Sequence, residues 1–257
     1  MTSNNDCLTI KGQQFNSRFI LGSGKYDYNL IKAAVKNAHA EIITMALRRT
    51  TEATEDILNY LPEHVTILPN TSGSTNAEEA VRIAHLAREL SGSNFIKLEV
   101  IPDKKYLLPD NQETVKATKI LAEEGFIVLP YMLPDLNTAK QLVDAGAATV
   151  MPLASPIGSN LGLANKNLIQ ILIDEIELPI IVDAGIGSPS QAAEAMEMGA
   201  DAVMTNTAIA TAEDIPLMAE AFRMGIEAGR KAYLAGLGRV VNHKAVASSP
   251  LQGISKQ

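Results

Sequence analysis

The chain has 257 residues, of which 46% are hydrophobic and 20% are charged, and its formal net charge is −7. These values predict a soluble globular protein with a sizeable core, and the acidic charge and lack of tryptophan argue against a nucleic-acid-binding surface. Cys7 is the only cysteine, which excludes an intramolecular disulfide and a cluster of thiolate metal ligands and fits a reducing compartment. Residues 1–6 are polar and lack a signal-peptide core, and no apolar run approaches the roughly 20 residues of a membrane helix. We therefore expect a cytoplasmic protein that binds neither nucleic acid nor a membrane.

Apolar strand patterns alternate with helical patterns along most of the chain. Residues 7–16 alternate weakly around Lys11 and Gly12, which predicts a short hairpin. Strands are predicted at 18–21, 41–47, 65–68, 94–100, 126–131, 148–153, 179–183 and 202–205. Helices are predicted at 27–38, 52–60, 76–90, 111–124, 135–145, 167–176, 189–198 and 213–235. The chain therefore consists mainly of eight predicted strand–helix units.

The spacing of these units indicates the fold class. The strands recur about every 25–30 residues and are apolar over nearly their whole length, as parallel strands covered on both faces are. Eight such units predict an α/β fold, a single-domain (β/α)8 TIM barrel with a short N-terminal hairpin. The barrel would span about residues 17–235 of a single domain, 1–257, with a polar tail from Gly236. An open doubly wound sheet is the alternative, but a full dinucleotide-binding glycine motif is lacking after the first strand.

The predicted strand 94–100 carries two charges in an otherwise apolar run. Side chains alternate along a strand, so Lys97 and Glu99 share one face and the apolar residues between them share the other. If the apolar face packs on helices, Lys97 and Glu99 point into the barrel, where an unpaired ion is costly. A lysine in an enclosed site can lose its charge more easily and act as an amine nucleophile. The alternative is a Lys–Glu pair at a solvated strand end.

Further unusual polar residues follow the predicted strands, which is where the active site of a parallel barrel lies. Asp183 ends the seventh strand and could face Lys97 and Glu99, and an amine with two carboxylates suits Schiff-base chemistry. The alternative for Asp183 is a helix cap or a loop brace. Arg48 and Arg49 could hold a second anionic group or pair with acids of another subunit. The remaining residues of this kind are Gly22, Ser23, Gly24, Lys25, Asn70, Thr71, Ser155, Gly158, Ser159, Asn206 and Thr207.

Two loops near the C-terminus have the composition of a phosphate-binding site. Residues 183–188 and 206–209 follow the seventh and eighth predicted strands, where many barrels bind a phosphate group. Glycine lets backbone N–H groups approach an anion, and a helix N-terminus adds positive potential. The alternative is that these glycines only form tight turns. The long segment 151–160 could be a lid or a second anion-binding loop, and the scattered histidines predict no metal site.

The chain closely resembles bacterial thiazole synthases, which make the thiazole phosphate half of thiamine. The resemblance is carried by Lys97-Leu98-Glu99-Val100-Ile101 and Val182-Asp183-Ala184-Gly185-Ile186-Gly187. It continues in order over about residues 8–250. The other matching segments are at 21–26, 46–49, 69–71, 108–110, 128–131, 150–153, 155–159 and 206–210.

The resemblance implies a transferase of sulfur-containing groups. Its substrates would be 1-deoxy-D-xylulose 5-phosphate, dehydroglycine (2-iminoacetate) and sulfur delivered as a thiocarboxylate on a small sulfur-carrier protein. Lys97 matches the Schiff-base lysine of the family, and Glu99 and Asp183 match its acid/base carboxylates. The sugar-phosphate contacts of the family match Gly158, Ala184, Gly185, Asn206 and Thr207. The resemblance implies no metal and no other cofactor, and the expected partners are the sulfur carrier, a dehydroglycine-generating enzyme and further copies of the chain in a homotetramer.

Four residues depart from the family pattern. Ser74 stands where a cysteine is expected, so a thiol cannot be required there, and Pro102, Ala154 and Asn160 occupy usual glycine positions. We expect these departures to affect loop geometry or docking of the sulfur carrier, and to leave the chemistry of Lys97 intact. The alternatives to a thiazole synthase are another Schiff-base sugar-phosphate barrel, such as an aldolase or a pyridoxal-phosphate-forming synthase, and a non-catalytic protein that binds sugar phosphates.

Overall fold

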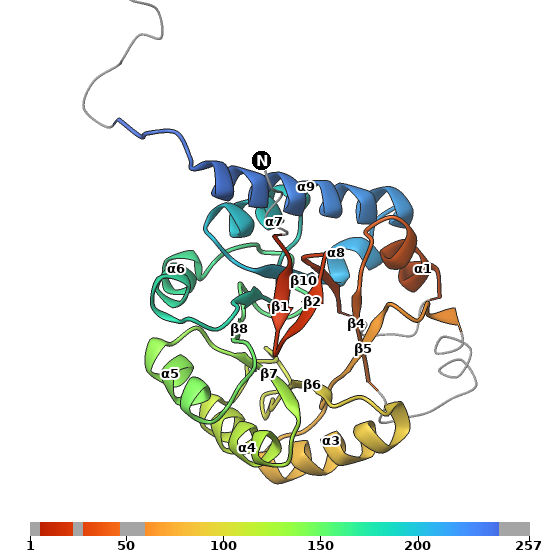
Figure 1. Ribbon diagram of the computed structural model, residues 1–257, viewed down its shortest axis with the longest axis vertical. Coiled ribbons are helices and arrows are strands. Elements are labelled where there is room, and N and C mark those ends of the chain that lie inside the picture. The colour runs from red at the N-terminus through yellow and green to blue at the C-terminus, as the bar shows by residue number, and fades with distance from the viewer. Residues whose placement is uncertain (1–5, 23–27, 47–59, 242–257) are drawn as a thin grey trace, which may run out of the picture.

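The computed structural model describes residues 6–22, 28–46 and 60–241, and these form a ring of parallel strands surrounded by helices (Figure 1). Two groups of hydrogen-bonded strands, in the order β5-β4-β3-β10-β9 and β6-β7-β8, make up the ring. Single parallel bridges from Asn70 to Lys97 and from Val150 to Ile180 join the two groups, which closes the barrel. The predicted (β/α)8 TIM barrel is therefore confirmed. The strands of the ring are β3 (Phe19–Leu21), β4 (Ile42–Met45), β5 (Thr66–Pro69), β6 (Phe95–Leu98), β7 (Ile127–Met132), β8 (Met151–Pro152), β9 (Ile181–Val182) and β10 (Ala202–Thr205).

The helices lie outside the ring and begin where the sequence supplies capping groups. Asn76, Asp110, Asp135, Ser188 and Asp214 each accept a hydrogen bond from a first-turn backbone N–H group of the helix that follows. These caps fix the points at which the chain leaves the strand ends and turns back. The helices are α1 (Tyr28–Lys36), α3 (Ala77–Ser91), α4 (Asn111–Glu123), α5 (Leu136–Asp144), α6 (Lys166–Glu175), α7 (Pro189–Glu197), α8 (Thr207–Ala210) and α9 (Ile215–Ala235).

A short antiparallel hairpin covers the N-terminal end of the barrel, in front of the ring in Figure 1. It consists of β1 (Leu8–Ile10) and β2 (Gln13–Phe15), as predicted. Its apolar side chains join those that point inward from the ring, and the Phe15 and Phe95 rings meet edge to face with centroids 6.3 Å apart. Because the hairpin and these side chains fill one end, a ligand can enter the ring only from the other.

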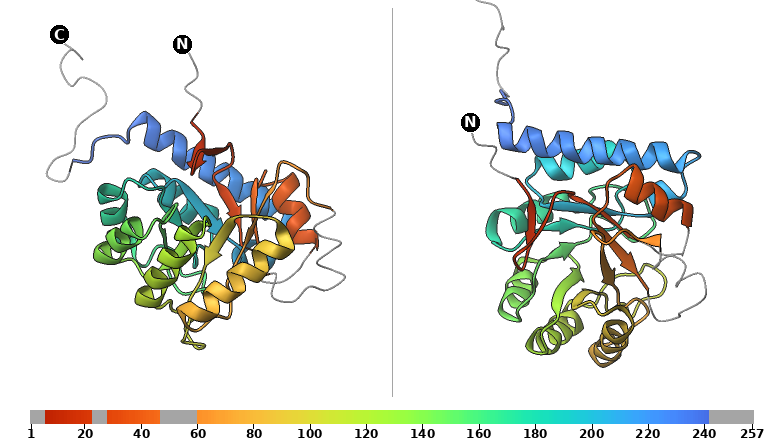
Figure 2. Two further views of the ribbon diagram at one scale, coloured as in Figure 1. Left: turned by 60° about the horizontal axis from the view of Figure 1, so that its bottom comes forward. Right: turned by 45° about the vertical axis from the view of Figure 1, so that its right-hand side comes forward.

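Helix α9 lies across the outside of the barrel against α7 (Figure 2). Two glycines of α9 permit this close approach. A Cβ atom at Gly229 would lie 2.3 Å from the carbonyl oxygen of Ala193, and one at Gly225 would lie 2.6 Å from that of Pro189. Both positions therefore need a residue without a side chain, because the α7 backbone cannot move away cheaply.

Most predicted elements agree with the structure to within a few residues, but three differences stand out. The strand predicted at 148–153 is observed only at Met151–Pro152, and the strand predicted at 179–183 only at Ile181–Val182. A few regular backbone hydrogen bonds are enough to hold a strand at this point of the ring. Helix α8 was not predicted, because four residues are too few to show a helical period. The helix predicted at 52–60 lies almost wholly outside the described residues. In the part of the chain that is described, no helix is long and apolar enough to cross a membrane.

Candidate active site

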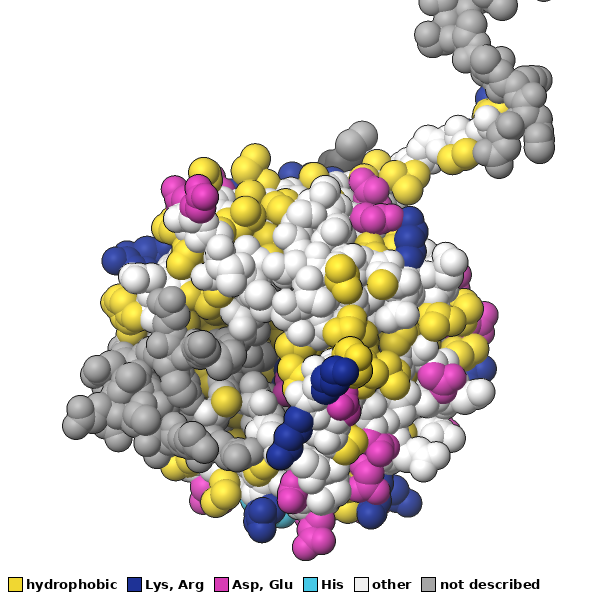
Figure 3. Space-filling view, turned by 180° about the vertical axis from the view of Figure 1, so that it is seen from behind, with side chains coloured by type: hydrophobic (Ala, Val, Ile, Leu, Met, Phe, Trp, Pro, Cys, Tyr) yellow, Lys and Arg dark blue, Asp and Glu magenta, His cyan; other side chains and the backbone are white. Residues whose placement is uncertain are grey.

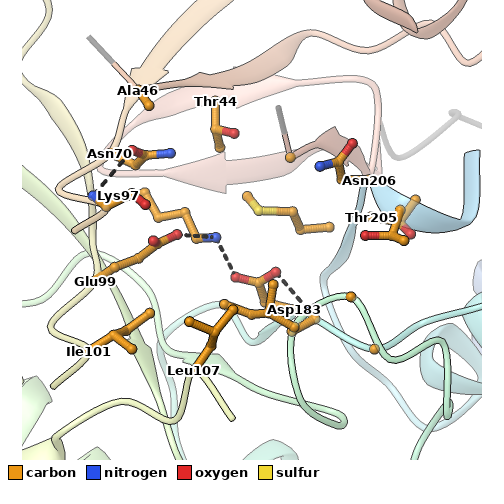
Figure 4. Close-up of a pocket in the computed structure, with 18 of the residues that line it drawn as sticks. Thr44, Ala46, Asn70, Lys97, Glu99, Ile101, Leu107, Asp183, Thr205 and Asn206 are labelled. Atoms are coloured by element: carbon orange, nitrogen blue, oxygen red, sulfur yellow. Dashed lines mark hydrogen bonds and ion pairs between the residues drawn. The ribbon is translucent and has the colours of Figure 1, made fainter. Parts of the chain in front are cut away.

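Strand β6 turns its charged face inward, which confirms the interpretation based on side-chain alternation. Ile96, Leu98 and Val100 pack in a cluster with apolar side chains of α3 and α4, on the outside of the barrel. Lys97 and Glu99 consequently point into the ring at its open end (Figure 4). The two residues do not form a solvent-exposed pair at a strand end, because only 6% of Lys97 and 7% of Glu99 is exposed.

The Lys97 ammonium lies between two carboxylates. Its Nζ atom is 2.9 Å from Oε1 of Glu99 and 2.7 Å from Oδ2 of Asp183. Asp183 follows β9 and is itself buried, and its Oδ1 accepts a hydrogen bond of 2.6 Å from the backbone N–H of Ala184. The structure thus brings together the three residues that the sequence analysis proposed as catalytic, and Asp183 pairs with Lys97 in addition to bracing its own loop.

The charge state of Lys97 corrects one expectation. Enclosure alone was expected to make this amine lose its proton more easily, and burial does act in that direction. The negative charges of Asp183 and Glu99 act in the opposite direction and outweigh burial, so the pKa of Lys97 is raised above its ordinary value. In the ligand-free protein Lys97 is therefore an ammonium ion, and it becomes a nucleophile only after it gives a proton to a neighbouring group.

A cavity of about 310 Å³ opens above these three side chains. Asn70 and Thr44 lie near Lys97 in the same view, and Thr205 lies beyond Asp183, next to Asn206 (Figure 4). All eight residues proposed as site residues from the sequence line this cavity: Lys97, Glu99, Asp183, Gly158, Ala184, Gly185, Asn206 and Thr207. They come from β6, from the loops after β8 and β9, and from the segment that joins β10 to α8, so only the closed ring brings them together.

The two loops that follow β8 and β9 are locked to each other beside this cavity. Ala184 and Gly185 have positive φ angles of 58° and 74°. A Cβ atom at Gly185 would lie 2.1 Å from Oγ of Ser155, which means that the loops are in direct contact. The Ser155 hydroxyl donates to the carbonyl of Gly162, whose N–H donates 2.7 Å to the carbonyl of Gly185. The long 151–160 segment is thus held in place on the β9–α7 loop.

The loop after β10 lies on the same side of the cavity. The chain passes from Asn206 directly into α8, and Thr207 is the first residue of that helix. A Cβ atom at Gly158 would lie 3.9 Å from Oγ1 of Thr207, so the β8–α6 loop reaches the start of α8. Backbone N–H groups at the start of a helix have no partner within the helix. Gly158, Gly185 and Thr207 therefore surround a region suited to an anion.

Several cavity residues were not predicted from the sequence. Thr44 and Thr205 lie in neighbouring strands, and Met204 and Leu107 add apolar surface. Asn70, which the sequence analysis named among the polar residues that follow the strands, also lines the cavity, whereas the apolar side chains carried no such signal. Ser23, Gly24, Lys25, Arg48 and Arg49, which the sequence analysis named as candidate polar or anion-binding residues, lie outside the described residues.

The four departures from the family pattern have different structural consequences. Asn160 has a φ angle of 53°, a conformation in which asparagine is one of the tolerated replacements for glycine. Ala154 and Pro102 do not have positive φ angles, so glycine is not required there by the backbone. Ser74 is fully buried, and its hydroxyl donates to the carbonyl of Glu99.

The rim of the cavity combines cationic and apolar side chains. Lys104 and Ile157 line the opening, and Tyr106 and Leu161 on the same two loops are 55% and 70% exposed. Figure 3 shows the face opposite to the hairpin, where hydrophobic side chains gather next to Lys or Arg side chains, with Asp or Glu side chains beside them. This face can therefore contact a partner through apolar surface and through charges of both signs.

The chain is similar to known thiazole biosynthesis proteins over nearly its whole length. Residues 9–250 match the family described as "Thiazole biosynthesis protein ThiG". A thiazole synthase of Clostridium beijerinckii is 69% identical over 249 residues, which cover 96% of this chain and 97% of that protein. A thiazole synthase of Fusobacterium nucleatum is 65% identical over the same shares of the two chains.

Solved structures are similar over comparable lengths. A chain in the structure described as the Amycolatopsis orientalis BexX/CysO complex is 37% identical, has a TM-score of 0.84 and is matched over 91% of this chain and 98% of its own. Thiamine phosphate pyrophosphorylase from Pyrococcus furiosus is only 13% identical with a TM-score of 0.54, over 83% of this chain and 96% of its own, which supports the barrel fold alone. Family match and near-full-length identity agree, and the chain therefore belongs to the ThiG family of thiazole biosynthesis enzymes.

Proposed function

We propose that this protein is a thiazole synthase that forms the thiazole phosphate precursor of thiamine through a Schiff base on Lys97. The substrates are 1-deoxy-D-xylulose 5-phosphate, dehydroglycine and sulfur carried as a protein thiocarboxylate. One observation carries the proposal: a buried lysine lies within 2.9 Å of one carboxylate and 2.7 Å of another at the base of a cavity. A lysine amine and two acid/base groups are what imine formation on a ketone requires.

Lys97 must lose a proton before it attacks the ketose carbonyl. Asp183 and Glu99 are the immediate acceptors, since each lies within hydrogen-bonding distance of Nζ. A carbonyl group that enters between Lys97 and the carboxylates weakens the ion pairs and leaves one carboxylate free to take the proton. The neutral amine then adds to the carbonyl carbon and gives a carbinolamine.

The two carboxylates divide the later proton transfers. The one protonated by Lys97 returns its proton to the carbinolamine hydroxyl, which leaves as water and gives the iminium ion, the protonated form of the imine. The positive charge of the iminium acidifies the neighbouring carbon, so the other carboxylate can remove a proton there and start the tautomerisation. Glu99 and Asp183 flank Nζ from different strands, and the two steps can therefore use different faces of the same intermediate.

The phosphate group of the ketose would bind beside the loops that contain Gly158, Gly185 and Thr207. Ala184 and Gly185 have left-handed backbone conformations, and both residues line the cavity. Asn206 adds a polar side chain at the start of α8. An anion held there leaves the other end of the sugar toward Lys97.

The partners follow from the same reaction. The sulfur carrier would dock over the open end of the barrel, where the exposed Tyr106 and Leu161 flank the cavity. The similar chain in the BexX/CysO structure was solved as a complex with another protein, which supports a partner on this fold. A dehydroglycine-generating enzyme would supply the second substrate, and a homotetramer is the proposed assembly.

The test is borohydride reduction in the presence of 1-deoxy-D-xylulose 5-phosphate, followed by intact mass measurement and peptide mapping. We expect one reduced ketose phosphate per chain, on Lys97. Lys97→Ala should abolish the adduct, and Lys104→Ala, at the other lysine described in the cavity lining, should keep it. An unmodified Lys97 in the parent protein would contradict the proposal, and retro-aldol turnover without a sulfur carrier would favour an aldolase.

A further inference from the structure

Glu99 lies just beyond the regular part of its strand. The ladder of β6 ends at Leu98, and no barrel strand pairs with the backbone of Glu99 among the described residues. The catalytic position of a side chain depends on the backbone that carries it. Some other element must therefore fix Glu99 relative to Lys97.

The loop between β5 and α3 supplies these contacts through two hydroxyl groups. Oγ1 of Thr71 accepts a hydrogen bond of 2.8 Å from the backbone N–H of Glu99. The same hydroxyl donates a hydrogen bond of 2.8 Å to the carbonyl oxygen of Glu99. A hydroxyl has one donor and two acceptor sites, so one group can make both bonds. The Ser74 hydroxyl donates to the same carbonyl at 2.5 Å. Both polar groups of the Glu99 backbone are thus bound to side chains of one loop.

The same loop is tied to the residues on either side of Glu99. The N–H of Thr71 donates 3.1 Å to the carbonyl of Lys97, and the N–H of Ile101 donates 2.9 Å to the carbonyl of Ser74. Thr71 and Ser74 are both fully buried, so bulk water cannot take over either contact. The loop consequently holds Lys97 and Glu99 in one fixed arrangement.

We propose that Thr71 and Ser74 are positioning residues that keep the carboxylate of Glu99 at working distance from Lys97. This inference rests on the acid/base role proposed above for Glu99. Asp183 holds Lys97 from the opposite side of the ring, so the amine stays in place when the hydroxyl clamp, Thr71 with Ser74, is removed. Loss of the clamp therefore impairs the proton transfers of Glu99 more than the formation of the Lys97 adduct.

The experiment compares five variants with the parent protein, and one of them, Glu99→Gln, is the reference for a lost carboxylate. Thr71→Val removes both side-chain contacts of Thr71 at nearly constant volume. Ser74→Ala removes the second hydroxyl that donates to Glu99, and it replaces Thr71→Val in the test if that variant does not fold. Thr71→Ser keeps the hydroxyl and should restore the parent behaviour. Thr118→Val is the matched control, because Thr118 is also fully buried but its hydroxyl only donates to Thr114 within α4.

The first readout needs no substrate. Acetic anhydride labelling at pH 9, followed by peptide mass spectrometry, gives the reactivity of Lys97 relative to the exposed Lys104. The Glu99 carboxylate helps to keep Lys97 protonated, and each pKa unit lost raises the neutral fraction about tenfold. Thr71→Val should raise the labelling ratio toward that of Glu99→Gln, and Thr118→Val should leave it at the parent value.

The second readout is kcat divided by the fraction of chains whose Lys97 forms an adduct that borohydride can trap. A displacement of about 1 Å is enough to cost up to a hundredfold in rate, so we expect kcat to fall about 10–100-fold in Thr71→Val with KM changed less than about threefold. Thr71→Ser should return to within about threefold of the parent. An unchanged labelling ratio or an unchanged kcat per trapped site in Thr71→Val and Ser74→Ala would overturn the inference. If the parent protein forms no adduct, that result contradicts the proposed function and not the role of the hydroxyl clamp. The labelling ratio alone then tests whether the clamp positions Glu99.

Discussion

Removal of the Lys97 charge is the most informative perturbation of the site. In Lys97→Met the carboxylates of Glu99 and Asp183, only 9% and 8% exposed at their side chains, lose the cation between them. Removing one partner from a buried ion pair typically costs about 3–5 kcal/mol, because it leaves an uncompensated charge. Without the cation the two carboxylates also repel each other in one enclosed site, which adds to this cost.

The cost should depend on pH in a defined direction. In the parent, the pKa of Lys97 is raised, so its stabilising contribution is complete below the ordinary lysine value and is lost only as the pH rises through the folded-state value. Between pH 5 and pH 7 the parent therefore shows no change from Lys97. The cost of Lys97→Met should therefore be complete at pH 7 and still complete at pH 9.

Urea unfolding of the parent and of Lys97→Met at pH 7 and pH 9 measures this cost. We expect it to be about 3–5 kcal/mol at both pH values. Lys166→Met is the control, since Lys166 pairs with Glu194 on the surface and such pairs contribute about 0–1 kcal/mol. A cost below about 1 kcal/mol at pH 7, no larger than that of a surface pair, would refute the reasoning, because the carboxylates would then be well hydrated without Lys97.

Three further substitutions test other parts of the structure. Gly229→Ala forces a Cβ atom to within 2.3 Å of the α7 backbone and should lower the free energy of unfolding by about 1–3 kcal/mol, whereas Gly238→Ala, with open space around it, should have no measurable effect in thermal unfolding. Gly185→Ala places a side chain at a positive φ angle and forces a Cβ contact of 2.1 Å to Ser155. The KM for the ketose phosphate should therefore rise at least about tenfold in steady-state kinetics. An unchanged KM would argue against a phosphate site at this loop. Tyr131→Phe removes a buried hydroxyl that has no hydrogen-bond partner among the described residues, so stability in urea should stay constant or increase by up to about 1 kcal/mol, and a loss of more than about 1 kcal/mol would show that the hydroxyl is bonded.

Much of the fold could be predicted because its signals are local. The alternation in strand 94–100 depends only on neighbouring residues, and it correctly assigned Lys97 to the inside and Ile96 to the helix side. The helix starts predicted at 76 and 189 lie within one residue of the observed starts at Ala77 and Pro189, because the residues that begin a helix are adjacent in the chain. Helix α8 and the short ladder at β8 could not, because a four-residue helix and a two-residue strand have no measurable period.

The contacts within the site depend on distances between remote parts of the chain. The approach of Asp183 to Lys97 follows from closure of the ring, and the sequence could only suggest that both end strands at the same edge. The contact between Ser74 and Glu99 had no signal at all, since a buried serine in a loop resembles any other loop residue. These contacts are set by packing of the whole barrel, which no short segment encodes.

The sequence by itself determined the order of strands and helices, the inward face of β6 and the residue types at the open end of the ring. Side-chain period and capping are properties of adjacent residues, and they persist whatever the rest of the chain does. Only the tertiary structure decided that Lys97 is held as an ammonium ion. Burial and two carboxylates act on that charge in opposite directions, and their balance depends on distances that the closed barrel sets.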